Sequence, residues 1–234
     1  MQLPTQLPLS VRLRSDAQFD NFITGSNDLL RAALEQLCEG RSNENTVYIY
    51  GSAGTGRTHL LQACCHRIEQ TGGSAIYLPA SECLALDPSI FESLEMFDLV
   101  CIDDIDQLLG HSHWEEALFH LYNRLRDLDR RLLIAACDTP TRVGADLPDL
   151  SSRLQWGLVL PLYELDDQEK LSVLSNSAIA RGLSVSTEVL QFILNHGSRN
   201  LSRLMHQLDE LDQASLRAKR KLTIPFVKQV LGWN

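Results

Sequence analysis

The segment GSAGTGRT, residues 51–58, constrains the fold more than any other stretch of the sequence. Before it, residues 46–50 (TVYIY) are β-branched and aromatic, as in a buried strand, and after it the apolar residues of 59–68 (HLLQACCHRI) recur at helical spacing. A glycine-rich run that joins a strand to a helix can turn its backbone N–H groups toward an anion, and the helix start adds its positive dipole end. The segment therefore predicts a phosphate-binding loop rather than a turn that binds nothing.

One residue departs from the phosphate-binding pattern GxxxxGK[ST]: Arg57 stands where the pattern has lysine. Arginine keeps the positive charge, but its side chain is planar, forked and longer, so the contact with a γ-phosphate is in question. Thr58 keeps the hydroxyl that would bind Mg²⁺. We expect nucleotide binding, whereas efficient hydrolysis by this chain is not assured.

Two carboxylates follow a second apolar run, in LVCIDDID at residues 99–106. Asp103 and Asp104 would lie at the carboxyl end of a strand, where open parallel sheets place their ligands. Asp103 is expected to hold the hydration shell of Mg²⁺, and Asp104 to orient a water molecule. Asp138 follows another predicted strand and could reach a γ-phosphate, although turn chemistry explains Asp138-Thr139-Pro140 equally well.

Strands and helices alternate up to residue 162, and only helices follow from residue 166. The alternation predicts an α/β domain with a parallel sheet. We therefore expect an extended arm over 1–14, an α/β domain over 15–163 and a small all-helical domain over 164–234. The predicted strands are 46–50, 74–78, 99–102, 131–136 and 157–162, and the later predicted helices are 114–128, 166–181, 186–195, 199–217 and 224–231.

Composition limits the classes of function. The chain has 234 residues and a formal net charge of -9, which argues against coating nucleic acid directly, so any DNA contact would go through a partner. It has neither an apolar run of membrane-spanning length nor a secretion signal, and no membrane role is expected. The six cysteines form no CxxC pair, which favours reduced thiols and a cytoplasmic location.

Gln6-Leu7-Pro8-Leu9-Ser10, in the arm, resembles the short peptide by which many bacterial proteins bind the replicative sliding clamp. In that peptide the glutamine makes hydrogen bonds and the leucines fill an apolar pocket, so Gln6, Leu7 and Leu9 are the candidate contacts. A disordered leader is the alternative. Further along, we expect the side chain of Arg153 to point outward.

A phosphate loop, an acidic strand end, a polar strand end, an arginine in Ser-Arg-Leu and a helical tail occur here in the order found in the AAA+ family of nucleotide-binding proteins. The segments DNFITGSN (20–27), IDDID (102–106) and SRLQWG (152–157) resemble the AAA+ domain of bacterial DnaA. The resemblance covers about residues 15–231. It implies an AAA+ P-loop NTPase domain followed by a helical lid domain.

The resemblance also implies roles for individual residues. Arg153 matches the arginine finger, which acts in trans on a nucleotide held by a neighbour, and Asp104 is the second catalytic candidate. Arg199 and Arg203 are both candidates for the lid arginine that senses phosphate. An alignment without gaps to the family pattern places Ser202 at that position instead. The residues placed at the nucleotide are Asn21, Phe22, Ile23, Ala53, Gly54, Thr55, Gly56, Arg57, Thr58, His59, Asp103 and Asp138.

The chain has the clamp-like arm and, after the lid, no DNA-binding domain, which resembles the DnaA-related proteins that shut off re-initiation. The implied function is negative regulation of replication initiation: tethered to the DNA-loaded sliding clamp, the β subunit of DNA polymerase III, the protein stimulates hydrolysis of ATP bound to DnaA. An adenine nucleotide with Mg²⁺ is implied, ADP rather than ATP, and assembly with further copies of the chain stays open. The alternative is a self-sufficient AAA+ ATPase such as a helicase loader.

Overall fold

The structure, a computed structural model, describes residues 13–233, which form two compact units. The described part of the first unit comprises residues 13–22, 28–51 and 57–162. The second unit comprises residues 23–27, 52–56 and the chain from Tyr163 onward. Residues 52–56 are the middle of the glycine-rich loop, so this loop connects two elements of the first unit while it groups with the second.

The first unit contains a five-stranded sheet with the order β2-β3-β4-β1-β5. Every pair of neighbouring strands is parallel, which confirms the predicted parallel sheet. Polar residues that follow β1, β3 and β4 therefore lie at the same edge of the sheet. The strands are β1 (Thr46–Tyr50), β2 (Ala75–Pro79), β3 (Leu99–Asp103), β4 (Arg131–Ala136) and β5 (Leu158–Pro161).

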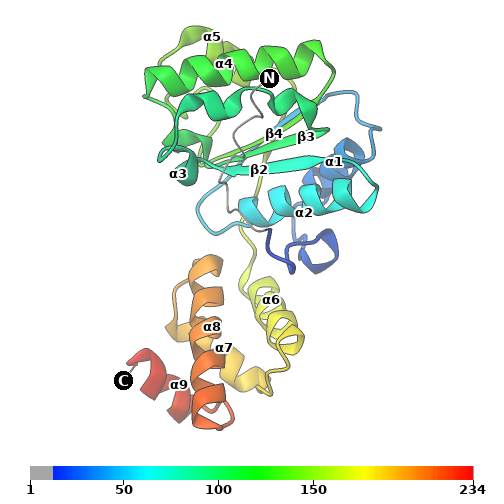
Figure 1. Cartoon of the computed structure of the whole chain (residues 1–234). Coiled ribbons are helices and arrows are strands. Elements are labelled where there is room, and N and C mark those ends of the chain that lie inside the picture. Colours follow the sequence, from blue (N-terminus) through cyan, green and yellow to red (C-terminus); the bar gives the residue numbers. More distant parts are fainter. Residues whose placement is uncertain (1–12, 234) are drawn as a thin grey trace, which may run out of the picture. The chain divides into compact units, whose positions relative to one another are not determined.

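Helices cover both faces of this sheet (Figure 1). On one face, α1 (Asp28–Cys38) and α2 (Arg57–Gln70) pack against Val47 and Ile49 of β1. On the other face, α3 (Ala80–Cys83), α4 (Ser112–Asp127) and α5 (Pro148–Leu154) pack against Tyr48. Alternate residues of one strand thus enter two separate cores, because successive side chains of a strand point to opposite faces.

A buried carboxylate orders the loop that precedes α5. The side chain of Glu115 on α4 is 1% exposed, and it accepts hydrogen bonds from the backbone N–H groups of Gly110 (2.7 Å), Asp146 (3.0 Å) and Leu147 (2.6 Å). Buried polar groups are costly unless they are hydrogen-bonded, and these three donors satisfy the carboxylate. Glu115 therefore holds the backbone that leads into α5.

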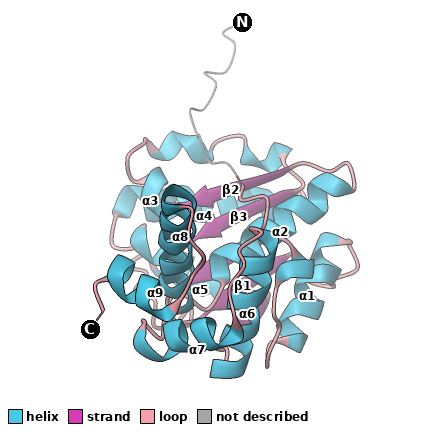
Figure 2. Cartoon of the chain, turned by 90° about the horizontal axis from the view of Figure 1, so that it is seen from below, coloured by secondary structure: helices cyan, strands magenta, loops and turns pink. Residues whose placement is uncertain are grey.

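The regular elements of the second unit are all helices (Figure 2): α6 (Asp167–Ala180), α7 (Thr187–His196), α8 (Leu201–Ala218) and α9 (Ile224–Leu231). Their core includes Leu174, Leu190, Leu208 and Phe226. Side chains cap three of the helices: Asp166 caps α6, Ser186 caps α7 and Asn200 caps α8. The expected all-helical lid domain is confirmed.

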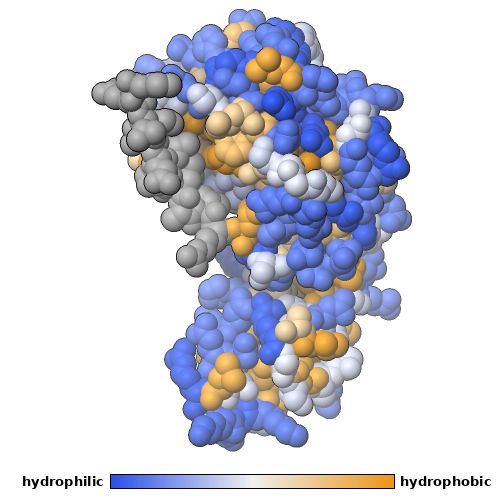
Figure 3. Space-filling model, turned by 45° about the vertical axis from the view of Figure 1, so that its right-hand side comes forward, coloured by the Kyte–Doolittle hydropathy of each residue, from blue (hydrophilic) through white to orange (hydrophobic). Residues whose placement is uncertain are grey.

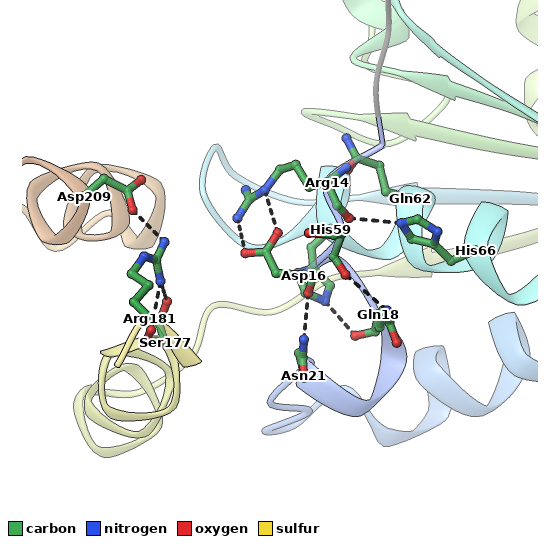
Figure 4. A network of polar contacts seen from close by, with 11 residues as sticks. Arg14, Asp16, Gln18, Asn21, His59, Gln62, His66, Ser177, Arg181 and Asp209 are labelled. Carbon is green, nitrogen blue, oxygen red and sulfur yellow. Dashed lines mark hydrogen bonds and ion pairs between the residues drawn. The ribbon is translucent and has the colours of Figure 1, made fainter. Parts of the chain in front are cut away.

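An arginine links the C-terminal end of α6 to α8. Arg181 donates a hydrogen bond of 2.6 Å to Asp209, and it also contacts Ser177 within α6 (Figure 4). These residues belong to the second unit alone. The contact joins two helices whose apolar sides share one core.

The face drawn in Figure 3 is mostly hydrophilic, with apolar residues in separate patches. Over residues 13–233, none of the helices combines the length and the apolar character that crossing a bilayer requires. The six cysteines, which all lie in this range, are free thiols, and all except Cys137 are buried.

Candidate nucleotide-binding site

Glycine is required at two positions of the connection between β1 and α2. Gly54 and Gly56 have φ angles of +87° and +106°, a region that other residues rarely adopt. Within the loop, Thr55 is buried and its hydroxyl donates to the carbonyl of Ser52 over 3.0 Å. This internally bonded turn is the kind of backbone that can bring N–H groups close to a phosphate.

Asn200, a residue that sequence reasoning did not select, contacts this loop inside the second unit. Its side-chain amide donates to the carbonyl of Ala53, and its Oδ1 accepts from the backbone N–H of Arg203, which caps α8. A Cβ atom on Gly54 would lie 2.5–2.7 Å from the Asn200 side chain. The available signal was an asparagine directly before an amphipathic helix, which indicates a cap and gives no hint of the loop contact.

The two arginines that are candidates for sensing phosphate, Arg199 and Arg203, have different surroundings. Arg199 is exposed, and its guanidinium lies 3.3 Å from the Asp167 carboxylate at the start of α6. Arg203 and Ser202 are exposed in the first turn of α8. Arg199 lines a pocket together with Ala53, Gly54 and Asn200, whereas Arg203 does not.

In the first unit, Thr58 and Asp103 meet as the sequence led us to expect. The Thr58 hydroxyl donates to Oδ2 of Asp103 over 2.6 Å, and the Tyr77 hydroxyl donates to the same oxygen over 2.7 Å. Asp103 is 3% exposed, and its Oδ1 is buried with no hydrogen-bond partner in the described chain. Burial raises the pKa of Tyr77, and the negative charge of nearby Asp103 raises it further. The Tyr77 hydroxyl therefore stays protonated and can donate to Asp103.

An unsatisfied buried carboxylate oxygen beside a threonine hydroxyl matches the ligands of a magnesium ion that also binds phosphates. Mg²⁺ takes oxygen ligands, keeps several waters, and is held by one or two protein groups together with the phosphates. Thr58 and Asp103 therefore fit this ion.

Arg57 is paired with Asp104. Its Nη2 lies 2.8 Å from Oδ1 of Asp104, and Nη1 is buried without a partner among the residues described. Asp104 has a left-handed backbone (φ +53°), which turns the chain out of β3. Burial raises the pKa of Asp104, the charge of Asp103 adds to this effect, and Arg57 opposes it. Part of the charge on Arg57 is thus compensated inside the protein, and its Nη1 amino group remains to donate to an anion.

Asp138 is engaged in local turn structure. Its carboxylate accepts from the Thr139 backbone N–H over 2.8 Å and lies 3.4 Å from Arg142. The Tyr48 hydroxyl donates to its backbone carbonyl over 2.9 Å. These contacts favour the turn interpretation that the sequence left open.

The segment that precedes the first long helix lies along α2 (Figure 4). The ring centroids of His59 and Phe22 lie 5.7 Å apart. Nε2 of His59 lies 2.9 Å from the backbone carbonyl of Gln18. Burial lowers the pKa of His59 and outweighs the hydrogen bond to Gln18, which by itself raises it. Asn21 is exposed and donates to the carbonyl of Asp16 over 2.9 Å. Phe22 and His59, both predicted at the nucleotide, are therefore neighbours, while Ile23 groups with the second unit.

Arg153 differs from its expectation, because its side chain does not simply point outward. It is partly buried: Nε donates to Oδ1 of Asn123 over 3.1 Å, and the guanidinium lies 4.0 Å from the Trp156 ring centroid and 5.8 Å from that of Phe119. Neutral partners of this kind leave no charge pattern in the sequence, because an amide and aromatic faces also hold a guanidinium. The clamp-like residues Gln6, Leu7 and Leu9 lie outside the described residues.

Solved structures of other proteins share the fold of this chain. Domain III of the replication initiation protein DnaA from Thermotoga maritima superposes with a TM-score of 0.85 at 24% identity, over 95% of this chain and 98% of that chain. AMPPCP-bound DnaA from Aquifex aeolicus gives a TM-score of 0.74 at 24% identity, over 89% and 68%. The Holliday junction branch migration motor RuvB from Thermotoga maritima gives 0.69 at 15% identity, over 92% and 71%. At these identities the likeness shows the fold.

Two family models cover most of the sequence. Residues 13–161 match the bacterial DnaA ATPase domain, and residues 167–231 match the lid domain of Hda. Together with the parallel sheet, these two matches define an AAA+ protein with a helical lid. The chain belongs to the bacterial DnaA ATPase domain family, as an Hda-like, DnaA-related AAA+ protein. Both matches support a DnaA-related regulator of replication initiation.

Proposed function

We propose that this chain is a nucleotide-bound adaptor that stimulates hydrolysis of ATP held by DnaA, with Arg153 as an arginine finger. In that step water attacks the γ-phosphorus, the bond to the bridging oxygen breaks, and ADP and phosphate leave. A guanidinium beside the γ-phosphate stabilises the charge of the transition state, and such fingers contribute roughly 10³ to 10⁵ in rate.

The surroundings of Arg153 give the strongest support. Asn123 and the Trp156 ring hold the guanidinium in one orientation, yet both are neutral. No carboxylate pairs with Arg153 within residues 13–233, so its full positive charge is available. A side chain that is oriented in advance and still charged is what electrostatic stabilisation of a transition state requires.

The chain's own nucleotide would serve mainly to fix its conformation. Thr58 and Asp103 would hold the magnesium ion, which neutralises phosphate charge, and the glycine-rich loop would bind the phosphates. Because Arg57 shares its charge with Asp104, it is less suited than a free lysine to a γ-phosphate. The proposal therefore includes ADP as the preferred nucleotide and slow turnover by this chain.

The N-terminal arm would supply the tether. Gln6, Leu7 and Leu9 would bind the β sliding clamp, so that the protein reaches DNA through the loaded clamp. With a net charge of -9, direct binding to the phosphate backbone is disfavoured, and an indirect route to DNA agrees with this charge.

Hydrolysis of ATP pre-bound to DnaA tests the finger. With clamp-loaded DNA, wild-type protein should accelerate phosphate release, and Arg153→Ala should lose about 10³-fold of that acceleration. The matched control is Arg217→Ala, which removes an exposed arginine of α8 and should retain full stimulation. Full stimulation by Arg153→Ala would refute the finger.

Capture on immobilised clamp tests the tether separately. Gln6→Ala should bind the clamp less well than wild type, while nucleotide binding stays unchanged. Equal capture of both proteins would rule out the proposed role of the arm. Rapid ATP hydrolysis by the purified chain without DnaA or clamp would favour the self-sufficient ATPase instead.

A further inference from the structure

A small pocket adjoins the glycine-rich loop within the second unit. Its volume is about 150 Å³, and its lining includes Ala53, Gly54, Glu164, Lys170 and Asn200. Two of these residues are part of the predicted phosphate-binding loop, and Lys170 comes from the first turn of α6. The pocket therefore brings a lysine of the lid to the loop.

Lys170 is a buried cation with one weak ionic partner among residues 13–233. Its side chain is 7% exposed, and its Nζ lies 3.9 Å from Oε2 of Glu164, whose side chain is 60% exposed. The other oxygen of Glu164 accepts from the Ser52 hydroxyl over 2.6 Å. Removing an ammonium from water is costly unless close anions compensate it, and an ammonium has three N–H groups to satisfy. One distant, hydrated carboxylate compensates it poorly.

The position of Lys170 in α6 adds to this cost. A cation in the first turn of a helix lies near the positive end of the helix dipole, where anions are favoured. The other charged residues of this turn, Asp167 and Glu169, are acidic as expected. Lys170 is the exception, and it lines the pocket together with Gly54 and Arg199.

We propose that Lys170 donates a hydrogen bond to a phosphate oxygen of the nucleotide held by the glycine-rich loop, and so supplies a cation that the loop partly lacks. The inference rests on the proposed nucleotide binding. Its physical basis is complementary charge, because Arg57 is paired with Asp104 while the Lys170 ammonium is buried and nearly unpaired. Lys170 acts here on nucleotide affinity; it has no part in the chemistry at the DnaA-bound ATP.

Nucleotide titrations that compare ADP with adenosine test this role, since adenosine has the same base and sugar and no phosphate. Fluorescent ADP would be displaced by ADP or by adenosine, using full-length wild type, Lys170→Met and Lys170→Arg. Lys170→Met should weaken ADP binding about 10-fold or more, as for a charge-assisted hydrogen bond, and leave adenosine within twofold of wild type. Lys170→Arg keeps the charge and should retain most of the ADP affinity.

The control is Lys221→Met, which removes an exposed lysine between α8 and α9 and should bind as wild type does. Circular dichroism without nucleotide shows whether each variant is folded; if Lys170→Met is not, Lys170→Gln takes its place in the same titration. Unchanged ADP affinity, or equal losses for ADP and adenosine, would overturn the role of Lys170. A wild-type protein that binds no ADP would instead remove the proposed nucleotide site itself.

Discussion

The hydroxyl of Thr58, in the first turn of α2, lies 2.6 Å from the Asp103 carboxylate at the end of β3. The two residues are 45 positions apart in sequence, and the parallel sheet brings them together because both β1 and β3 end at the same edge. At their meeting point, Oδ1 of Asp103 is buried and has no hydrogen-bond partner in the part of the chain that the structure describes. The Mg²⁺ chemistry we propose depends on this pair.

Asp103→Asn should remove the magnesium-dependent part of nucleotide binding. Wild-type protein should bind ADP more tightly with Mg²⁺ than with EDTA, and the variant should bind equally in both, because an amide is a weaker ligand than a carboxylate. Calorimetric titration measures both affinities. Asp127→Asn, which changes an exposed carboxylate of α4, is the control and should respond to Mg²⁺ as wild type does. A magnesium effect that persists in Asp103→Asn would contradict this assignment.

Gly54→Ala should destabilise the loop for two reasons. The φ angle of +87° costs an alanine about 1–2 kcal/mol, and the new Cβ would meet the Asn200 side chain. Gly54→Ala/Asn200→Ala relieves the second effect only, so the double variant should lose about 1 kcal/mol less than the sum of the single losses. Urea unfolding gives the three values. Strict additivity would mean that Asn200 does not limit the space at Gly54.

Glu115→Gln should lower the free energy of unfolding by about 2–3 kcal/mol, because an amide group would face backbone N–H donors that a buried carboxylate now satisfies. The adjacent Glu116 is exposed, so Glu116→Gln is a matched control and should change stability by less than about 0.5 kcal/mol. Urea unfolding compares the two. Equal stability of both variants would show that the loop before α5 does not depend on this carboxylate.

The stability of the protein should contain a pH-dependent part that comes from His59. Burial lowers its pKa in the folded state, so below the unfolded value of about 6.5 the unfolded chain binds a proton that the folded chain does not. This contribution is present above that pH and is lost as pH falls toward the folded pKa. The slope of stability against pH should therefore be smaller in His59→Gln than in wild type, and unchanged in His206→Gln, whose ring is exposed on α8. An unchanged slope in His59→Gln would exclude His59 as its source.

The sequence predicted local elements better than contacts between them. The bounds of β1, β4 and α9 agree with the predicted 46–50, 131–136 and 224–231, because their apolar periods and flanking residues are local signals. The helix after the loop begins at Arg57, two residues before the expected 59, since Arg57 and Thr58 form its first turn. The strand order could not be predicted, because a βαβ unit fixes handedness and leaves open which strands become neighbours.

The candidate site shows the same limit. Thr58 was predicted from the spacing of the glycine-rich motif, and Asp103 and Asp104 from their place at the end of an apolar strand. Asn200 and Lys170 were missed, since each reaches the loop from more than 100 residues away and neither has a local pattern that predicts such a contact.

The most direct test of the account is to follow whose ATP is hydrolysed. DnaA carrying γ-labelled ATP would be mixed with this protein carrying unlabelled ADP on clamp-loaded DNA. In the reverse arrangement, run in parallel, this protein would carry γ-labelled ATP and DnaA would carry unlabelled ATP. The account predicts that labelled phosphate is released quickly when the label is on DnaA, that release slows about 10³-fold with Arg153→Ala, and that the reverse arrangement stays slow. Fast release from this protein's own ATP, without stimulated release from DnaA, would contradict it.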